Sequence, residues 1–307
     1  MSRNRTDHGE RDPGCPRRCY LEPMDLRAPE GSTPTLNADA PWAAFDPRAY
    51  IDHNYRDLLN ADAEILERVR DHFSNHFREN FERPVLGIDV GAGANLYPAL
   101  SMLPWCREIT LFERAPANVA YLRSQRDRFD DHWDSFWELL RQEKAYEEIH
   151  TDRRDRFRKA VRVRSGDLFD LTRRNLIGLR PDMGRWQIGT MFFVAESLTG
   201  SYTEFRRAVE CFMLALAPGA PFAAAFMEGS SGYDVGNQHF PACNVSESQV
   251  YDILKLYGKV DIWRLGESSH MVRPGHTGMI LVCGHRNADF APSALSTWLN
   301  MPFRRHC

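Results

Sequence analysis

The pattern of apolar and polar residues predicts that strands and helices alternate along most of the chain. Residues 85–90 form a largely apolar run bounded by a proline and a glycine, which is typical of a buried parallel strand. A glycine turn at Gly91 and Gly93 follows, then a segment with leucines at helical spacing. A second short strand, 108–112, ends at Glu113. This order is that of the first βαβ unit of a nucleotide-binding sheet.

The same pattern predicts further helices and strands along the rest of the chain. The expected helices cover 61–77, part of 119–163, 202–216 and 247–257, and the expected strands lie within 161–170, 185–200, 221–227 and, as an antiparallel pair, 260–286. The Gly- and Ser-rich segment 229–241 predicts a mobile loop. This is the layout of an α/β domain. We therefore expect a Rossmann-like seven-stranded sheet with helices on both faces and its last strand antiparallel.

The two ends of the chain differ from this alternating region. Residues 1–40 are rich in Pro, Arg, Asp and Gly and predict a disordered leader. An aromatic-rich segment and the first helix follow, and they form either an N-terminal helical lid over a ligand, 41–80, or an arm that caps the core. The folded domain then spans 41–286, and 287–307 form a C-terminal tail.

Composition narrows the class of protein. The chain has 307 residues, a formal net charge of −3 and 43% hydrophobic residues. These values give no reason to expect a nucleic acid or a membrane as partner, and we expect a cytoplasmic protein, by default a monomer with oligomers left open. Cys15 and Cys19 would supply half of a zinc site, but no second Cys or His pair lies at a matching distance. No metal is therefore expected.

The glycine turn and the acid after it predict a nucleoside ligand. Glycines let the backbone approach a ligand where a Cβ atom would clash. Glu113 lies 22 residues after Gly91, at the carboxyl end of the second strand, where a carboxylate can accept both hydroxyls of a ribose. Leu96 stands where a dinucleotide fingerprint needs glycine or alanine, which disfavours NAD. The alternative is an ordinary turn followed by a surface glutamate.

Other acids follow the remaining strands. Asp167 comes just after the third strand, where it would read an adenine amino group or only cap the next turn. Glu196 and Glu228 follow the fourth and fifth strands. Because the carboxyl ends of parallel strands meet at one edge of a sheet, we expect these acids to lie near the glycine turn.

Five stretches of the chain carry a family resemblance. They are FDPRAYIDHNY (45–55), DVGAGANLY (89–97), EITLFERAPAN (108–118), GDL (166–168) and AES…TEF (195–205). Together they resemble the class I S-adenosylmethionine-dependent methyltransferases of the nicotinamide, phenylethanolamine and thioether methyltransferase family. The resemblance covers roughly residues 41–286 and implies S-adenosylmethionine as cofactor, with S-adenosylhomocysteine as product.

The resemblance also implies which residues bind the cofactor. Tyr50 and Tyr55 would cover it, and Glu113 would take the place of the family's usual aspartate at the ribose. The full implied set is Tyr50, Tyr55, Gly91, Gly93, Tyr97, Glu113, Asn118, Asp167, Leu168 and Phe192.

The implied substrate contacts match less well. They are Trp42, Asn54, Glu196, Glu228, Tyr233 and His276. Relatives that bind a cationic or amide substrate place an aspartate just before the final strand, where this chain has Arg273 to His276. Glu196 and Glu228 would act catalytically by orienting an ammonium group and accepting its proton, or would be structural acids. His270 and His276 are candidate bases or only polar loop residues.

The resemblance and the residues together predict a methyltransferase that acts on a small molecule. An amine nitrogen is the expected acceptor. The alternatives are an oxygen or sulfur acceptor, or a non-catalytic protein that binds the cofactor as a scaffold. Methylation of nitrogen and methylation of oxygen or sulfur differ only in the acceptor atom, which no motif identifies.

Overall fold

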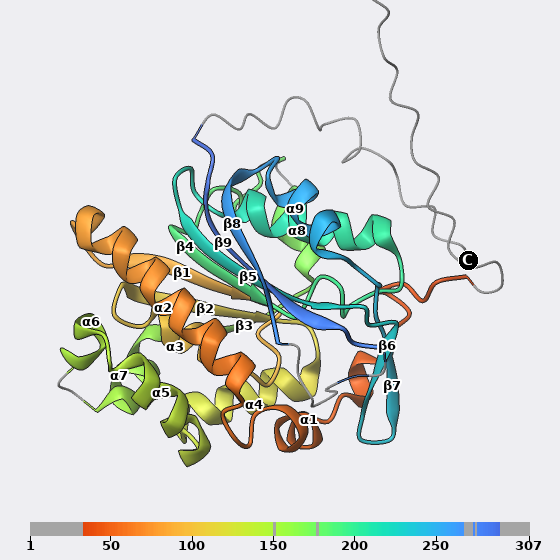
Figure 1. The fold of residues 1–307 in the computed structure, drawn as a ribbon, viewed down its shortest axis with the longest axis horizontal. Helices are drawn as coiled ribbons and strands as arrows, with labels where there is room; N and C mark the ends of the chain where they lie inside the picture. Colours follow the sequence, from red (N-terminus) through yellow and green to blue (C-terminus); the bar gives the residue numbers. More distant parts are fainter. Residues whose placement is uncertain (1–32, 150–151, 176–177, 267–272, 274, 289–307) are drawn as a thin grey trace, which may run out of the picture. The chain divides into compact units, whose positions relative to one another are not determined.

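Seven strands form one mixed sheet in the order β3-β2-β1-β4-β5-β9-β8 (Figure 1). The computed structural model describes residues 33–149, 152–175, 178–266, 273 and 275–288. The strands are β1 (Val85–Val90), β2 (Cys106–Glu113), β3 (Val161–Ser165), β4 (Ile188–Phe192), β5 (Pro221–Glu228), β8 (Gly258–Leu265) and β9 (Gly278–Arg286). β1 to β5 run parallel, whereas β9 lies antiparallel between β5 and β8. The expected sheet, with its last strand antiparallel, is confirmed.

The strand order changes direction at β1. This strand pairs with β2 on one side and with β4 on the other. The turn after β1 stays close to β2, because the backbone N–H of Gly91 donates to the carbonyl of Phe112 at 2.7 Å. Ligands of such sheets bind at the carboxyl ends of the strands beside this switch point. The ends of β1, β2 and β4 are therefore where a site is expected.

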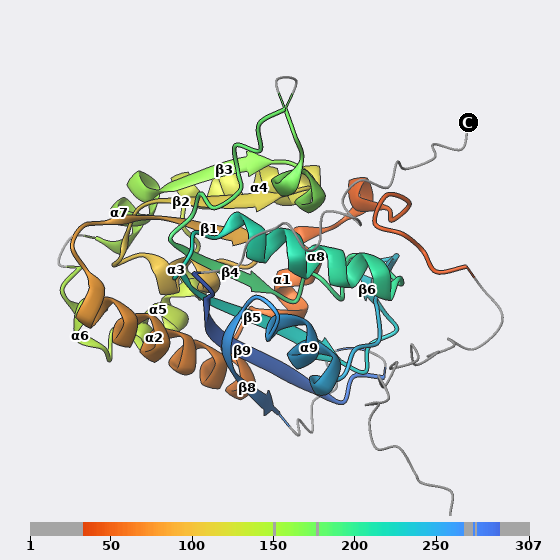
Figure 2. The same ribbon diagram turned by 90° about the horizontal axis from the view of Figure 1, so that it is seen from above.

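Helices cover both faces of the sheet, as the sequence predicts (Figures 1 and 2). One core packs α2 (Asn60–Asn80), α3 (Tyr97–Met102), α5 (Asp134–Leu140) and α7 (Arg153–Ala160) on one face, and the other packs α8 (Tyr202–Ala215) and α9 (Glu247–Leu254) on the opposite face. Successive residues of a strand point to opposite faces. β2 thus contributes Leu111 to the first core and Phe112 to the second.

The N-terminal segment packs from Pro34 onward. Its elements are η1 (Trp42–Ala44) and α1 (Pro47–Asn54), and Asp46 caps α1 by accepting hydrogen bonds from two backbone N–H groups. Asn37 is buried, and its side chain donates to Asp167 at 3.1 Å. The packed chain therefore starts earlier than the boundary at 41 that composition suggests. Most of the expected leader, 1–32, lies outside the described residues.

The segment 229–241 is a hairpin and not the mobile loop that its glycines and serines predict. β6 (Gly232–Val235) pairs antiparallel with β7 (Gln238–Pro241). Tyr233 stands opposite Phe240, and their rings stack with centroids 5.5 Å apart. Aromatic pairs across strands stabilise a hairpin. The Gly and Ser content of the segment gave no indication of this aromatic pair.

The stretch 119–163 is broken into short helices. They are α4 (Pro116–Asp127), η2 (Asp131–Trp133), α5, α6 (Lys144–Glu147) and α7. α9 begins with a capping box, in which Ser246 and Gln249 bond to each other's backbone. Of the expected C-terminal tail, only residues 287 and 288 are described. Across the described part of the chain, no helix has the length and apolar character needed to cross a membrane.

Candidate functional site

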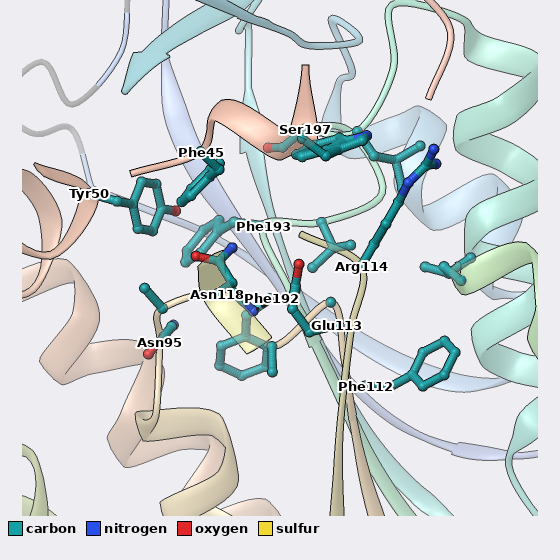
Figure 3. Close-up of a pocket in the computed structure, with 18 of the residues that line it drawn as sticks. Phe45, Tyr50, Asn95, Phe112, Glu113, Arg114, Asn118, Phe192, Phe193 and Ser197 are labelled. Atoms are coloured by element: carbon teal, nitrogen blue, oxygen red, sulfur yellow. Dashed lines mark hydrogen bonds between the residues drawn. The ribbon is translucent and has the colours of Figure 1, made fainter. Parts of the chain in front are cut away.

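A cleft of about 750 Å³, partly open to solvent, lies at the carboxyl ends of β1, β2 and β4. Residues of the N-terminal segment and of the hairpin join these strand ends in its walls. Of the residues chosen from the sequence, those that line it are Trp42, Tyr50, Tyr55, Gly91, Gly93, Glu113, Asn118, Asp167, Leu168, Phe192 and Tyr233. Residues far apart in the sequence therefore meet in one place (Figure 3).

The turn after β1 requires glycine. Gly91 and Gly93 both have positive φ, +65° and +58°. A Cβ atom on Gly91 would lie 2.4 Å from Cγ1 of Val194, so no larger residue fits there. A Cβ atom added to Gly93 would have as its nearest neighbour the carbonyl oxygen of Gly91, 3.7 Å away. The backbone at Gly93 is thus open on the side of the cleft.

Glu113 and Asn118 face the cleft from the end of β2 and the start of α4 (Figure 3). Glu113 is only 6% exposed, and its two carboxylate oxygens accept the N–H groups of Ala115 at 2.6 Å and Gly93 at 2.9 Å. Burial raises the pKa of Glu113, and these hydrogen bonds oppose the rise. Oδ1 of Asn118 is buried and has no hydrogen-bond partner among the described residues. This set of acceptors suits a ligand with neighbouring hydroxyl groups.

Asp167 holds the N-terminal segment over the end of β3. Its carboxylate accepts the backbone N–H of Phe169 at 3.0 Å, which caps η3 (Leu168–Thr172). It also pairs with Arg114 at 2.6 Å and accepts from the Asn37 side chain. The capping role that the sequence left open is therefore present, together with a place in the wall of the cleft.

Aromatic rings form the opposite wall of the cleft. Tyr50 contacts Phe45 with ring centroids 5.3 Å apart and Tyr55 at 5.7 Å. Tyr97 lies behind Tyr55 and does not line the cleft: it is fully buried, and its hydroxyl donates to Asp62 at 3.1 Å. Tyr97 contacts Tyr55 edge to face at 5.8 Å. It is placed to support the aromatic wall from below.

The two glutamates chosen as catalytic residues do not line the cleft. Glu196 is 0% exposed, and its Oε1 accepts from the Met227 backbone at 3.1 Å and the Ser197 hydroxyl at 3.0 Å. Its Oε2 has no partner among the described residues. Burial raises the pKa of Glu196. It lies directly behind Ser197, which does line the cleft.

Glu228 takes part in a polar cluster at the end of β5. Its Oε2 accepts from Arg264 at 2.7 Å and from the Thr277 hydroxyl at 3.0 Å. Burial acts to raise its pKa, but these hydrogen bonds outweigh burial and hold the pKa below the ordinary value. His276 lies nearby, outside the cleft lining, and burial lowers its pKa. His270 lies outside the described residues.

A smaller chamber of about 290 Å³ adjoins the cleft. The two spaces share four lining residues, Tyr50, Tyr55, Phe193 and Arg273. Asn54 lines only the chamber, and its side chain donates to the Tyr50 carbonyl at 2.8 Å.

Several residues of the site were not predicted. Asn37 was assigned to the leader, and Phe193 has a positive φ of +59° that no sequence pattern signals. Ser197 and Arg273 are joined by a hydrogen bond of 2.6 Å although 76 positions separate them. The departure from the family pattern at 273–276 was the only available signal for Arg273.

Metal ligands are not grouped in this region. Among the residues that the structure describes, no set of three or more His, Cys, Asp or Glu side chains is arranged to hold a metal ion.

Solved methyltransferase structures resemble this chain distantly. The N-methyltransferase NodS from Bradyrhizobium japonicum has 12% identity, with 80% of this chain and 94% of that chain covered and a TM-score of 0.45. A 1,6-didemethyltoxoflavin-N1-methyltransferase from Burkholderia thailandensis has 13% identity, 78% and 87% coverage and a TM-score of 0.43. A comparison with curated protein sequences gives no match.

A family model gives the decisive comparison. The model of the NNMT/PNMT/TEMT family matches residues 34–286, which is most of the chain. The match begins at Pro34, where the packed N-terminal segment begins. The chain therefore belongs to the NNMT/PNMT/TEMT family of S-adenosylmethionine-dependent methyltransferases.

Proposed function

We propose that this methyltransferase acts on the nitrogen of a small-molecule amine. The observation that carries the proposal is the arrangement around Ser197. This hydroxyl lines the cleft and donates to the buried carboxylate of Glu196 at 3.0 Å. An amine must lose a proton to become a neutral product, and a buried carboxylate behind a hydroxyl can take that proton.

The residues of the cleft fit the cofactor of the family. We propose that Glu113 binds the ribose hydroxyls, in line with its place at the end of β2 beside the open backbone of Gly93. The buried, unpartnered Oδ1 of Asn118 supports a polar ligand group at the same spot. Asp167 and Leu168 would border the adenine. S-adenosylmethionine supplies an electrophilic methyl group on a sulfonium when it is bound.

The main task of the protein is to align the acceptor and exclude water. Alignment alone can contribute about 7–11 kcal/mol to lowering a reaction barrier. The faces of Tyr50 and Tyr55 would accept a positive charge out of water, because aromatic rings attract cations. Tyr97 would act through Tyr55, which it contacts. We propose that these rings, with Trp42, close the site.

The two glutamates would play different parts. The raised pKa of Glu196 and its contact with Ser197 support a role as proton acceptor. Glu228 is paired with Arg264 and keeps a lowered pKa, which makes it a poor proton acceptor. We propose that Glu228 orders the end of β5 through Arg264 and Thr277, next to His276, while Tyr233 borders the substrate from the hairpin.

The position of the transferred methyl group tests the proposal directly. The enzyme is incubated with ¹³C-methyl-labelled S-adenosylmethionine and a mixture of small amines, alcohols and thiols. Carbon NMR of the product distinguishes N-, O- and S-methyl groups. We expect an N-methyl signal that Glu196→Gln reduces and that the surface variant Glu138→Gln retains. An O- or S-methyl signal would contradict the nitrogen assignment.

A further inference from the structure

Arg273 is a buried cation in the wall of the site. The residue is 4% exposed, and its guanidinium carbon lies 4.2 Å from the centre of the Tyr233 ring. One N–H donates to the Ser197 hydroxyl at 2.6 Å. Arg273 borders both the cleft and the smaller chamber.

This guanidinium has no carboxylate partner within the described part of the chain. Asp62 lines the same chamber, yet the two residues form no ion pair, and Asp62 instead accepts the hydroxyl of Tyr97. Glu196 forms no direct ion pair with Arg273: the two charges attract each other at longer range, and their hydrogen-bonded link runs through Ser197. A buried charge without a direct counterion is costly, and stacking on a ring offsets only a small part of that cost.

The free edge of Arg273 faces the cleft, which a ligand can enter. The guanidinium carries five N–H donors, and the described residues accept from one of them. The chamber beside it has room for about one water molecule, so a ligand group reaches Arg273 from the cleft. A planar anion is the ligand group that matches a guanidinium edge best.

We propose that the methyl acceptor carries a carboxylate that binds Arg273, so that the substrate is an amino acid or another amine with an acidic group. The inference rests on the proposed function, because it places the acceptor in the part of the cleft that Arg273 lines. Arg273 thereby acts as the residue that determines substrate specificity. Ser197 would hold its guanidinium in place.

A second source of a carboxylate is the methionine part of the cofactor. The two sources differ in what Arg273→Gln changes. If Arg273 bound the cofactor, this variant would lose affinity for S-adenosylhomocysteine but keep its affinity for 5′-methylthioadenosine, which lacks the amino-acid part. We expect instead that the affinity for both compounds is unchanged within about twofold.

The acceptor is tested on protein saturated with S-adenosylhomocysteine. Amino acids and the amines that lack their carboxylate are titrated by calorimetry in matched pairs. We expect the amino-acid member of at least one pair to bind, and Arg273→Gln to weaken it by about ten- to a hundredfold, the cost of losing a charged hydrogen bond. Arg273→Lys should restore part of the affinity, and the surface variant Arg141→Gln should behave as the unaltered protein.

The inference is overturned if the amines bind as well as their amino acids, if no compound in the panel binds, or if Arg273→Gln binds amino acids unchanged. These outcomes are separate from failure of the proposed function. A protein that binds amino acids through Arg273 but yields an O- or S-methyl product would keep this inference and lose the nitrogen assignment. If only amines without a carboxylate gave an N-methyl product, the nitrogen assignment would stand and this inference would fail.

Discussion

The backbone N–H of Gly93 donates a hydrogen bond of 2.9 Å to the carboxylate of Glu113. The glycine turn after β1 and the acid after β2 are thus joined directly. The turn holds Glu113 at the wall of the cleft, and Glu113 in turn fixes a backbone that has positive φ at Gly91 and Gly93. The site depends on both.

Replacing Glu113 with alanine should weaken cofactor binding. The ribose hydroxyls would lose a charged acceptor, which costs about 1–3 kcal/mol. Calorimetry with S-adenosylhomocysteine measures the loss, and Glu138→Ala, on an exposed face of α5, serves as the control. Equal affinity in Glu113→Ala and the unaltered protein would remove Glu113 from the ribose site.

Alanine at Gly91 should destabilise the fold. The substitution combines an unfavourable positive φ, about 1–3 kcal/mol, with a Cβ atom 2.4 Å from Val194. Gly219→Ala is a matched control, because Gly219 also has positive φ but a Cβ there meets no atom within 4 Å. In thermal unfolding, Gly91→Ala should have a clearly lower unfolding temperature than Gly219→Ala. Equal unfolding temperatures would show that the contact with Val194 relaxes freely.

Alanine at Asn37 should release the N-terminal segment. Asn37 donates to Asp167, and the Trp42 indole donates to the Asn37 carbonyl at 2.9 Å and to its side-chain oxygen at 3.1 Å. We expect S-adenosylhomocysteine to dissociate about tenfold faster, which corresponds to the loss of a buried hydrogen bond. Stopped-flow tryptophan fluorescence measures this rate, with Asn75→Ala as control. An unchanged rate would mean that the segment does not retain the ligand.

The buried carboxyl of Asp62 should make stability depend on pH. Burial raises its pKa from 3.8 to about 7, so the folded protein holds a proton that the unfolded chain releases. Its contribution to stability is complete below pH ~4 and is lost as pH rises to about 7.

Asp62→Asn isolates this contribution, because asparagine keeps an oxygen for the Tyr97 hydroxyl and does not ionise. The free energy of unfolding of the unaltered protein, relative to Asp62→Asn, should fall by up to about 4 kcal/mol between pH 4 and pH 7. Urea unfolding at several pH values gives this difference. A difference that stays constant over the range would show that Asp62 is already ionised in the folded protein.

Local sequence patterns predicted the sheet and several of the residues that line its cleft. The apolar run of β1, the glycines after it and the acid at the end of β2 are set by short-range geometry, and the structure brings Gly91, Gly93 and Glu113 to one cleft. The order of strands and helices fixed the antiparallel end of the sheet in the same way.

Residues whose roles depend on tertiary packing were not accessible to the same reasoning. Glu196 was expected at the sheet edge, but its full burial behind Ser197 follows from the path of the chain after β4. The contact of Asn37 with Asp167 spans 130 positions, and that of Arg273 with Ser197 spans 76. The hairpin β6–β7 places Tyr233 against Phe240, a contact between strands that the glycines of the segment did not indicate.

The central claim is that the cleft at the ends of β1, β2 and β4 holds S-adenosylmethionine. Calorimetric titration of the purified protein with S-adenosylhomocysteine tests it most directly, because it requires no knowledge of the acceptor. We expect one-to-one binding with a dissociation constant on the order of micromolar, about −8 kcal/mol. A folded sample that shows no binding would contradict the claim and leave the cleft without its ligand.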